Sequence, residues 1–170
     1  PVLARELSSI YYAPLILVHA AYSRSQVGHP LNGFGFLSGA DQKHPLLGSI
    51  WDSSVFEGRA PADEALLTFF IGGAKHPGVL KWQERDFLAL IRKVAAPVLK
   101  INGDPKKVWI KKYERAIPQY FLGHREKMET IEKEAAKIKG LHLTGNYFTG
   151  VSLGDTARHA EKIAWDTHEL

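Results

Sequence analysis

The sequence has no cysteine, so a disulfide scaffold, a thiolate metal site and a cysteine nucleophile are all excluded. It has no apolar run near the ~18 residues that a membrane-spanning helix needs. It also has no internal repeat and no low-complexity tract, which excludes fibrous and disordered classes. The lack of cysteine fits a reducing compartment, and we expect a cytoplasmic protein.

What is present is the composition of an ordinary globule. The 170 residues are 45% hydrophobic and 24% charged, and the formal net charge is +4. So small a surplus attracts anionic partners only where it is concentrated. Four lysines do gather around Trp109, at 106–107 and 111–112, but alternation along this segment and the nearby Glu114 favour the solvated edge of a sheet. We therefore expect no nucleic-acid partner.

Hydrophobic patterning divides the chain into a strand-rich first part and a mixed second part. Four segments of the first part read as strands, namely 15–21, 33–37, 47–51 and 66–71. Glycine-rich turns join them and no helical pattern intervenes, so they predict an antiparallel sheet. Within 33–37, glycine alternates with aromatic residues, which suits a strand that another group approaches closely.

The second part combines helices with strands. Segments 83–99, 124–139 and 155–166 have helical periodicity, whereas 107–112 and 141–146 read as strands. In the first helix, the apolar stripe is expected at Phe87, Ile91, Val94 and Val98, with Pro97 and the turn 102–105 ending the helix. The elements together predict an α+β or α/β fold.

Side chains for common hydrolytic and metal chemistry are poorly placed in the sequence. The eight histidines are scattered, with no His-x₃-His spacing, so we expect no metal site. Asp52 with Ser53 and Ser54 and a distant histidine could be imagined as a triad. Because no Gly-x-Ser-x-Gly elbow surrounds these serines, a turn with hydroxyl-to-backbone hydrogen bonds is the better interpretation.

The segment 144–155 is the most informative one chemically. It runs from an expected strand through a glycine-rich turn into a helix N-terminus, where backbone N–H groups and the helix dipole attract anionic groups. Glycines let a flat or anionic group approach the backbone itself. The residues alone leave two interpretations open: a cofactor-contact turn, or a plain connection with Asp155 as the helix N-cap.

Five motifs occur in one order with consistent spacing. They are 31–37 (LNGFGFL), 51–61 (WDSSVFEGRAP), 70–74 (FIGGA), 115–120 (RAIPQY) with 122–124 (LGH), and 145–147 (GNY) with 150–151 (GV). Together they resemble the C-terminal portion of the oxygen-dependent protoporphyrinogen oxidases, flavoproteins related to the amine oxidases. The resemblance covers essentially the whole chain. It implies an FAD enzyme of haem biosynthesis that dehydrogenates a porphyrinogen and passes electrons to O₂.

The same resemblance implies a set of cofactor-binding residues. The turn 151–153 would lie against the flavin ring, where N–H groups at a helix start would stabilise the anionic reduced flavin. Tyr113 stands where bacterial relatives often have a tryptophan near the flavin. The implied set is Tyr113, Gly145, Asn146, Val151, Ser152 and Leu153. Because the flavin carries the redox chemistry, no catalytic side chain is expected, in agreement with the absence of a triad.

Four residues match positions that line the porphyrinogen pocket, namely Phe34, Gly35, Leu37 and Phe70. Aromatic and aliphatic walls suit a flat, largely apolar macrocycle, and the carbonyl of Gly35 could accept a hydrogen bond from a pyrrole N–H. The substrate implied is protoporphyrinogen IX.

The sequence departs from the family pattern in two places. After Gly-Val-Ser-Leu the family usually continues Pro-Asp-Cys-Ile-x-Ser-Gly, whereas here Gly154 and Asp155 follow, and His159 stands where serine is expected. In addition, no Gly-x-Gly-x-x-Gly motif follows any expected strand, so the module that holds the ADP half of FAD is missing. We therefore expect activity only together with an N-terminal half of the enzyme.

The resemblance also predicts two domains. Residues 1–112 would be the C-terminal half of the substrate-binding domain, an antiparallel sheet plus helices. Residues 113–170 would complete the FAD-binding, Rossmann-like domain with its last strand and helix.

Several alternatives stay open from the sequence. The substrate could be coproporphyrinogen III, whose additional carboxylates call for further cationic groups. The chain could also be a non-catalytic relative that binds porphyrin or a protein without flavin. Peripheral membrane contact and a homodimer are left open too, although a charge of +4 spread along the chain is a weak electrostatic anchor.

Overall fold

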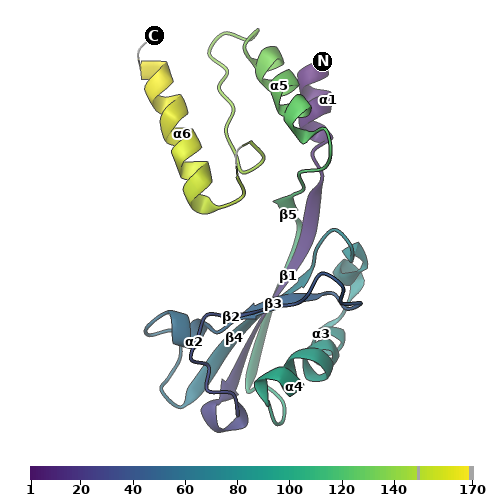
Figure 1. Cartoon of the computed structure of the whole chain (residues 1–170), viewed down its shortest axis with the longest axis vertical. Helices are drawn as coiled ribbons and strands as arrows, with labels where there is room; N and C mark the ends of the chain where they lie inside the picture. Colours follow the sequence, from purple (N-terminus) through teal and green to yellow (C-terminus); the bar gives the residue numbers. More distant parts are fainter. Residues whose placement is uncertain (149, 169–170) are drawn as a thin grey trace. The chain divides into compact units, whose positions relative to one another are not determined.

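The computed structural model describes residues 1–148 and 150–168, which form two compact units. Residues 14–114 form one, hereafter the sheet unit; residues 1–13 and 115 onward form the other, hereafter the helical unit. Strands β1 (Tyr12–Ser23) and β5 (Lys107–Pro118) run from one unit into the other. Figure 1 shows the elements of each unit.

The sheet unit contains a five-stranded sheet in the order β2-β3-β4-β1-β5. Its remaining strands are β2 (Gly35–Leu37), β3 (Leu46–Ile50) and β4 (Glu64–Gly72). The pairs β2–β3, β3–β4 and β4–β1 are antiparallel. Each expected strand of residues 15–71 and the strand at 107–112 is present, so the predicted antiparallel sheet is confirmed.

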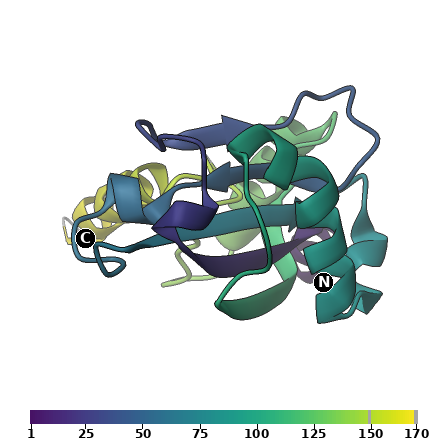
Figure 2. The same cartoon turned by 90° about the horizontal axis from the view of Figure 1, so that it is seen from below.

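Alternation along the strands creates one buried and one open sheet face. In β4, residues 65, 67, 69 and 71 are fully buried, while Leu66 and Phe70 between them are only half-buried. On the neighbouring β1, Ile16, Val18 and Ala20 are buried in the same way. Figure 2 shows the sheet and its helices from another side. We call the less buried side the open face.

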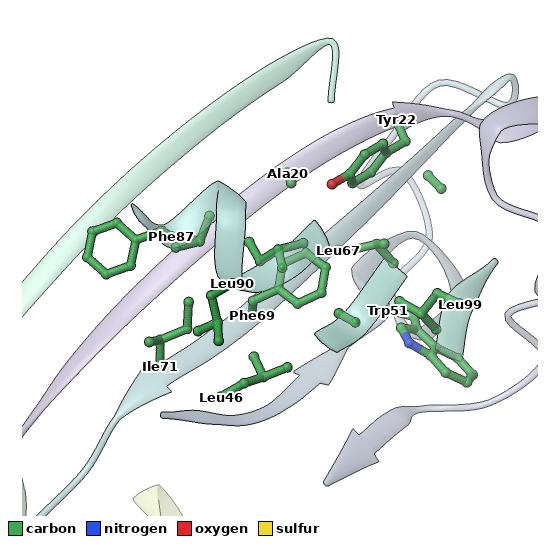
Figure 3. Close-up of a cluster of buried hydrophobic side chains, with 14 of the residues drawn as sticks. Ala20, Tyr22, Leu46, Trp51, Leu67, Phe69, Ile71, Phe87, Leu90 and Leu99 are labelled. Atoms are coloured by element: carbon green, nitrogen blue, oxygen red, sulfur yellow. The ribbon is translucent and has the colours of Figure 1, made fainter. Parts of the chain in front are cut away.

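Short helices connect and cover the strands of this unit. The small helix α2 (Asp52–Val55) joins β3 to β4, and a 3₁₀ turn at Pro77–Lys81 follows β4. The covering helix has three parts: α3 (Glu84–Leu90), a π turn at Ile91–Ala95 and α4 (Ala96–Leu99). Phe87, Leu90 and Leu99 from this helix pack among Leu67, Phe69 and Ile71 of the sheet, as Figure 3 shows.

The π turn shifts the apolar stripe that the sequence predicts. Ala95 and Leu99 are buried, whereas Val98 is exposed and Val94 only half-buried. A π turn holds an extra residue, so the residues after it turn onto a different side of the helix. It ends two residues before Pro97, which cannot donate a hydrogen bond and whose ring crowds the preceding turn. The helix predicted at 83–99 does end at Leu99, before Lys100, whose φ is +51°, so Pro97 lies within its last turn.

The helical unit contains α1 (Val2–Ser8), α5 (His124–Ala135) and α6 (Leu153–His168). A small core joins Ile10, Met128 and Ile131. The helices predicted at 124–139 and 155–166 are confirmed, although α5 ends at Ala135 and leaves Ile138 exposed. None of the described helices is both long and apolar enough to cross a bilayer.

The strand predicted at 141–146 does not form. Residues 141–144 have no regular structure and a turn begins at Gly145. A strand needs a neighbouring strand to satisfy its N–H and C=O groups. Among residues 1–148 and 150–168, no strand pairs with this segment.

Candidate cofactor and substrate sites

The turn that precedes α6 is closed by Ser152, which caps the helix. Ser152 Oγ accepts a hydrogen bond from the N–H of Asp155 at 3.0 Å and donates one to Asp155 Oδ2 at 2.6 Å. The bond from Ser152, assisted by Arg158, holds the pKa of the Asp155 carboxyl below its usual range. In the interpretation of this segment as a plain connection, Asp155 is the N-cap; the structure instead places Ser152 at the N-cap and Asp155 three positions into the helix.

Side chains at the start of α5 hold the segment before this turn. Tyr120 Oη donates to the carbonyl of Asn146 at 2.6 Å, and His124 Nε2 donates to the carbonyl of Tyr147 at 2.7 Å. The two rings stack, with centroids 4.1 Å apart and planes 11° apart. Burial raises the pKa of the Tyr120 hydroxyl, which therefore stays a donor at neutral pH. The motif 115–124 thus fixes the motif 145–147 through two backbone carbonyls.

Two glycines allow the tight path of this segment. Gly145 has φ +156°, and a Cβ there would lie 2.5 Å from the Tyr147 ring. A Cβ on Gly150 would lie 2.5 Å from Asp155 Oδ2. At Gly154, by contrast, no neighbour lies closer than 3.8 Å. Gly145 and Gly150 therefore have structural reasons to be glycine, whereas the backbone at Gly154 is approachable.

The turn offers the features that a flavin ring requires. Within residues 1–148 and 150–168, the N–H groups of Leu153 and Gly154 have no acceptor, as expected for the first turn of a helix. Leu153 is 87% exposed, and Val151 is half-exposed beside it. Free N–H donors next to apolar side chains fit one edge of a flat ring that carries negative charge. The residues at 151–154 therefore fit the group that the resemblance implies.

His159, the residue that departs from the family pattern, packs inside the helical unit. Its Nδ1 lies 2.9 Å from Thr144 Oγ1, and its ring centroid lies 5.0 Å from that of Phe148. It also lines a cavity of about 420 Å³ together with Leu141, Leu143 and Ile163. His159 therefore joins α6 to the segment 141–148 by a hydrogen bond and an aromatic contact that serine could not both supply.

Removing the Ser152 hydroxyl is expected to weaken the start of α6. Ser152→Ala should cost about 1 kcal/mol, because the N–H of Asp155 loses its acceptor. Amide hydrogen exchange in the first turn of α6 measures this loss. Ser152→Thr keeps a hydroxyl and should retain protection; equal exchange in both variants would contradict the cap.

The Asp155 carboxyl adds a pH dependence. Since its folded-state pKa is depressed, its stabilising contribution is present above its usual pKa and disappears as the pH falls through the folded value.

The structure places the ten predicted site residues in two groups. Gly145, Asn146 and the turn 151–153 come together around the start of α6, all in the helical unit. Tyr113 lies on β5 in the sheet unit, half-exposed, with Lys111 Nζ 5.7 Å from its ring centroid. The four predicted substrate residues also lie in the sheet unit.

Strand register places three of the four substrate residues on the open face. Gly35 pairs with Ile50, Leu37 with Gly48, and Gly48 with Phe70. Paired residues on neighbouring strands share a face, so Gly35, Leu37 and Phe70 lie on the same side of the sheet. Leu37 is 89% exposed, and Phe34, just before β2, is 63% exposed. Phe34, Leu37 and Phe70 together form an apolar surface, hereafter the apolar wall, that is free to contact a ligand.

Gly35 itself is required by packing within the sheet. A Cβ at this position would overlap the carbonyl oxygen of Ser49 and lie 2.9 Å from its carbon. Gly48 is similarly pressed against the carbonyl of Phe36. The close approach predicted from the glycine-aromatic alternation is therefore that of β3 to β2.

Three side chains on the open face, those of Asp52, Thr68 and His19, form a hydrogen-bonded network that the sequence did not predict. Thr68 Oγ1 donates to Asp52 Oδ2 at 2.6 Å, and His19 Nδ1 lies 2.7 Å from Thr68 Oγ1. The hydroxyl has one proton and gives it to the carboxylate, so His19 Nδ1 must be the donor to Thr68. The Nε2 atom of His19 is then the ring nitrogen left for another partner.

No local pattern marked His19 or Thr68, and Asp52 was considered only beside Ser53 and Ser54 with a distant, unspecified histidine. Asp52 comes from α2, Thr68 from β4 and His19 from β1, and only the sheet register brings His19 opposite Thr68. The neighbouring Ser53 behaves as expected for a structural hydroxyl, because its Oγ accepts from the N–H of Leu66 at 3.2 Å.

The fold is shared with two solved structures. One, "Putative protoporphyrinogen oxidase" from Exiguobacterium sp. 255-15, matches 98% of this chain and 37% of its own with a TM-score of 0.79 and 20% identity. The other, reduced UDP-galactopyranose mutase, matches 84% of this chain and 30% of its own with a TM-score of 0.63 and 13% identity. In both solved structures the matching region is part of a longer chain.

The relatives found by sequence are more similar to this chain than the two solved structures are. Protoporphyrinogen oxidase 1, chloroplastic, from Arabidopsis thaliana is 33% identical over 98% of this chain, and the chloroplastic protoporphyrinogen oxidase of Nicotiana tabacum is 34% identical over 95%. Coproporphyrinogen III oxidase of Bacillus subtilis is 22% identical over 88%. No family model matches. The chain is a homologue of the protoporphyrinogen oxidases, which confirms the resemblance, and it spans about one third of the length of these relatives.

Proposed function

We propose that this chain supplies one part of a flavin-dependent oxidase that converts protoporphyrinogen IX to protoporphyrin IX with O₂ as the acceptor. The observation that carries the proposal is the sequence similarity to protoporphyrinogen oxidases along nearly the whole chain. The plant relatives are named chloroplastic or mitochondrial; for this chain we keep the cytoplasmic location that the lack of cysteine favours.

In this proposal the start of α6 contacts FAD. Conversion of a porphyrinogen to a porphyrin removes six electrons and six protons, so bound FAD would supply three successive two-electron oxidations with one O₂ as the acceptor for each, and no nucleophilic side chain is required. The N–H groups of Leu153 and Gly154 would donate to the ring and stabilise its negative charge in the reduced form. Ser152 contributes by closing the turn, and Tyr120 and His124 fix the carbonyls of Asn146 and Tyr147. Tyr113 is the further proposed flavin contact.

The open face of the sheet unit would contact the porphyrinogen. Phe34, Leu37 and Phe70 supply apolar surface for the macrocycle, and Gly35 keeps β2 close to β3 so that these side chains remain in place. A flat, largely apolar ligand suits such a wall. The sheet unit would thus be the substrate-binding part, and the helical unit would complete the flavin-binding domain.

The proposal needs a further segment, because the sequence has no Gly-x-Gly-x-x-Gly motif for the ADP half of FAD. We infer that an N-terminal half of the enzyme provides it. The chain by itself is then expected to bind FAD weakly and to leave porphyrinogens unchanged.

The test compares the purified chain alone with the chain combined with the part of a protoporphyrinogen oxidase relative that it does not cover. Flavin absorbance reports cofactor binding, and porphyrin fluorescence reports turnover of protoporphyrinogen IX or coproporphyrinogen III. We expect stoichiometric flavin and turnover only in the combined protein. Stoichiometric FAD with turnover by the chain alone would show that no second segment is needed. Bound flavin without turnover of either porphyrinogen would overturn the oxidase function, and turnover of coproporphyrinogen III alone would change the substrate.

A further inference from the structure

A cavity of about 420 Å³ lies within the sheet unit, beside the apolar wall described above. Strands β1, β4 and β5 supply His19, Leu66, Lys107 and Trp109, and residues 59–61 from the loop after α2 form another side. His19 and Leu66 belong to the open face, because His19 pairs with Thr68 and Leu66 lies two positions further along β4.

The charged side chains around this cavity leave an excess of positive charge. Arg59 and Lys107 both line it, and the acidic lining residue is Glu64. Glu64 forms an ion pair with the neighbouring Lys106, so its charge is already matched. The Arg59 guanidinium lies 5.4 Å from the ring centroid of Phe56, which helps to hold it at the loop. Arginine and lysine are the side chains that bind carboxylates.

The cavity also has a flat apolar side. Trp109 is 52% exposed, and its ring is available to a planar ligand. His19 adds a polar group of fixed orientation, since its Nδ1 donates to Thr68 Oγ1, which in turn donates to Asp52. Along β4 the open face therefore changes from apolar at Phe70 to polar at Thr68 and cationic around Leu66, over roughly 13 Å of strand.

We propose that this cavity binds a carboxylate group carried by a flat, largely apolar ligand, with Arg59 and Lys107 as the charged partners and Trp109 as the apolar side. The identity of the ligand rests on the proposed function: in the oxidase it would be a carboxylate side chain of the porphyrinogen, whose ring lies along the wall that contains Phe70. A porphyrinogen with more carboxylates would use the cavity more strongly.

The test uses the full chain and two stable porphyrins, coproporphyrin III and its tetramethyl ester, which share a ring but differ in charge. Porphyrin fluorescence titration gives each dissociation constant. Arg59→Gln with Lys107→Gln is expected to weaken binding of the acid about tenfold or more, because charge-assisted hydrogen bonds are lost, and to leave the ester unchanged. Arg85→Gln with Lys93→Gln, on the helix that covers the other face, removes one arginine and one lysine charge as well; it is the control for net charge and should change neither affinity.

Three results would each overturn the cavity as a carboxylate site. They are equal weakening of acid and ester, the same loss of acid binding in Arg85→Gln with Lys93→Gln, and no difference between the Arg59→Gln, Lys107→Gln variant and the original chain. The outcome is separate from that of the oxidase test, because no flavin or turnover is involved. Acid-selective binding that depends on Arg59 and Lys107 supports the site even where the combined protein fails to oxidise a porphyrinogen; in that case only the identity of the natural ligand changes.

Discussion

Replacing Phe69 with alanine is expected to lower the free energy of unfolding by about 3–5 kcal/mol. Phe69 is fully buried between the sheet and the covering helix, packed in the cluster that contains Leu67, Phe87 and Leu90 (Figure 3). Truncation removes the aromatic ring and leaves a cavity that rigid strands on both sides of β4 can fill only in part. Urea denaturation measures the change, provided that the slope with denaturant is unaltered.

The adjacent residue provides the matched control. Phe70 points to the open face and is only half-buried, so Phe70→Ala should cost about 1 kcal/mol. In the proposed function the same substitution weakens binding of the porphyrin tetramethyl ester, since Phe70 belongs to the apolar wall. A loss of stability in Phe70→Ala as large as in Phe69→Ala would contradict the assignment of the two faces.

Replacing Gly35 with alanine is expected to destabilise the β2–β3 pair by about 3 kcal/mol. The new Cβ would overlap a backbone carbonyl, that of Ser49, and no side-chain rotation relieves such a clash. The strands must separate, and the backbone hydrogen bonds around Phe36 are then lost. Denaturant unfolding measures the overall loss, and amide exchange at β2 and β3 shows whether it begins there.

Gly78→Ala is the control for a glycine without close neighbours, since no atom lies within 4 Å of a Cβ built there. This substitution should leave stability nearly unchanged. If Gly35 served only to admit a ligand, Gly35→Ala would leave the unfolding free energy at its original value and would weaken ligand binding alone. That result would contradict the structural role assigned to it.

Local pattern was sufficient for most elements of the fold. Short apolar segments bounded by turn residues predicted β1, β3 and β4, and the periodicity at 124–139 predicted α5. The local pattern failed where pairing or packing with another segment determines the structure. The segment 141–146 has the alternation of a strand, yet no described strand pairs with it. The stripe through Val98 assumed a uniform helix, and the π turn before Pro97 moved the buried positions to Ala95 and Leu99.

For the candidate sites too, the sequence indicated the segments but not the contacts that hold them. The motifs at 31–37 and 145–151 identified the segments because glycine and aromatic residues at fixed spacing are local signals. The contacts that hold those segments were not predictable. Tyr120 and His124 reach carbonyls more than twenty positions away, and His19 meets Thr68 only through the pairing of β1 with β4. Such partners share no spacing along the chain.

The sequence by itself determined the antiparallel sheet, the helices, the absence of thiol chemistry and the resemblance to one family, because these depend on composition and on residues close in the chain. The tertiary structure alone decided that Gly35 serves the approach of β3, that Ser152 caps α6, and that Arg59, Lys107 and Trp109 surround one cavity. The physical reason is that overlap, hydrogen-bond partners and the grouping of charges depend on distances between segments, which strand register and packing set.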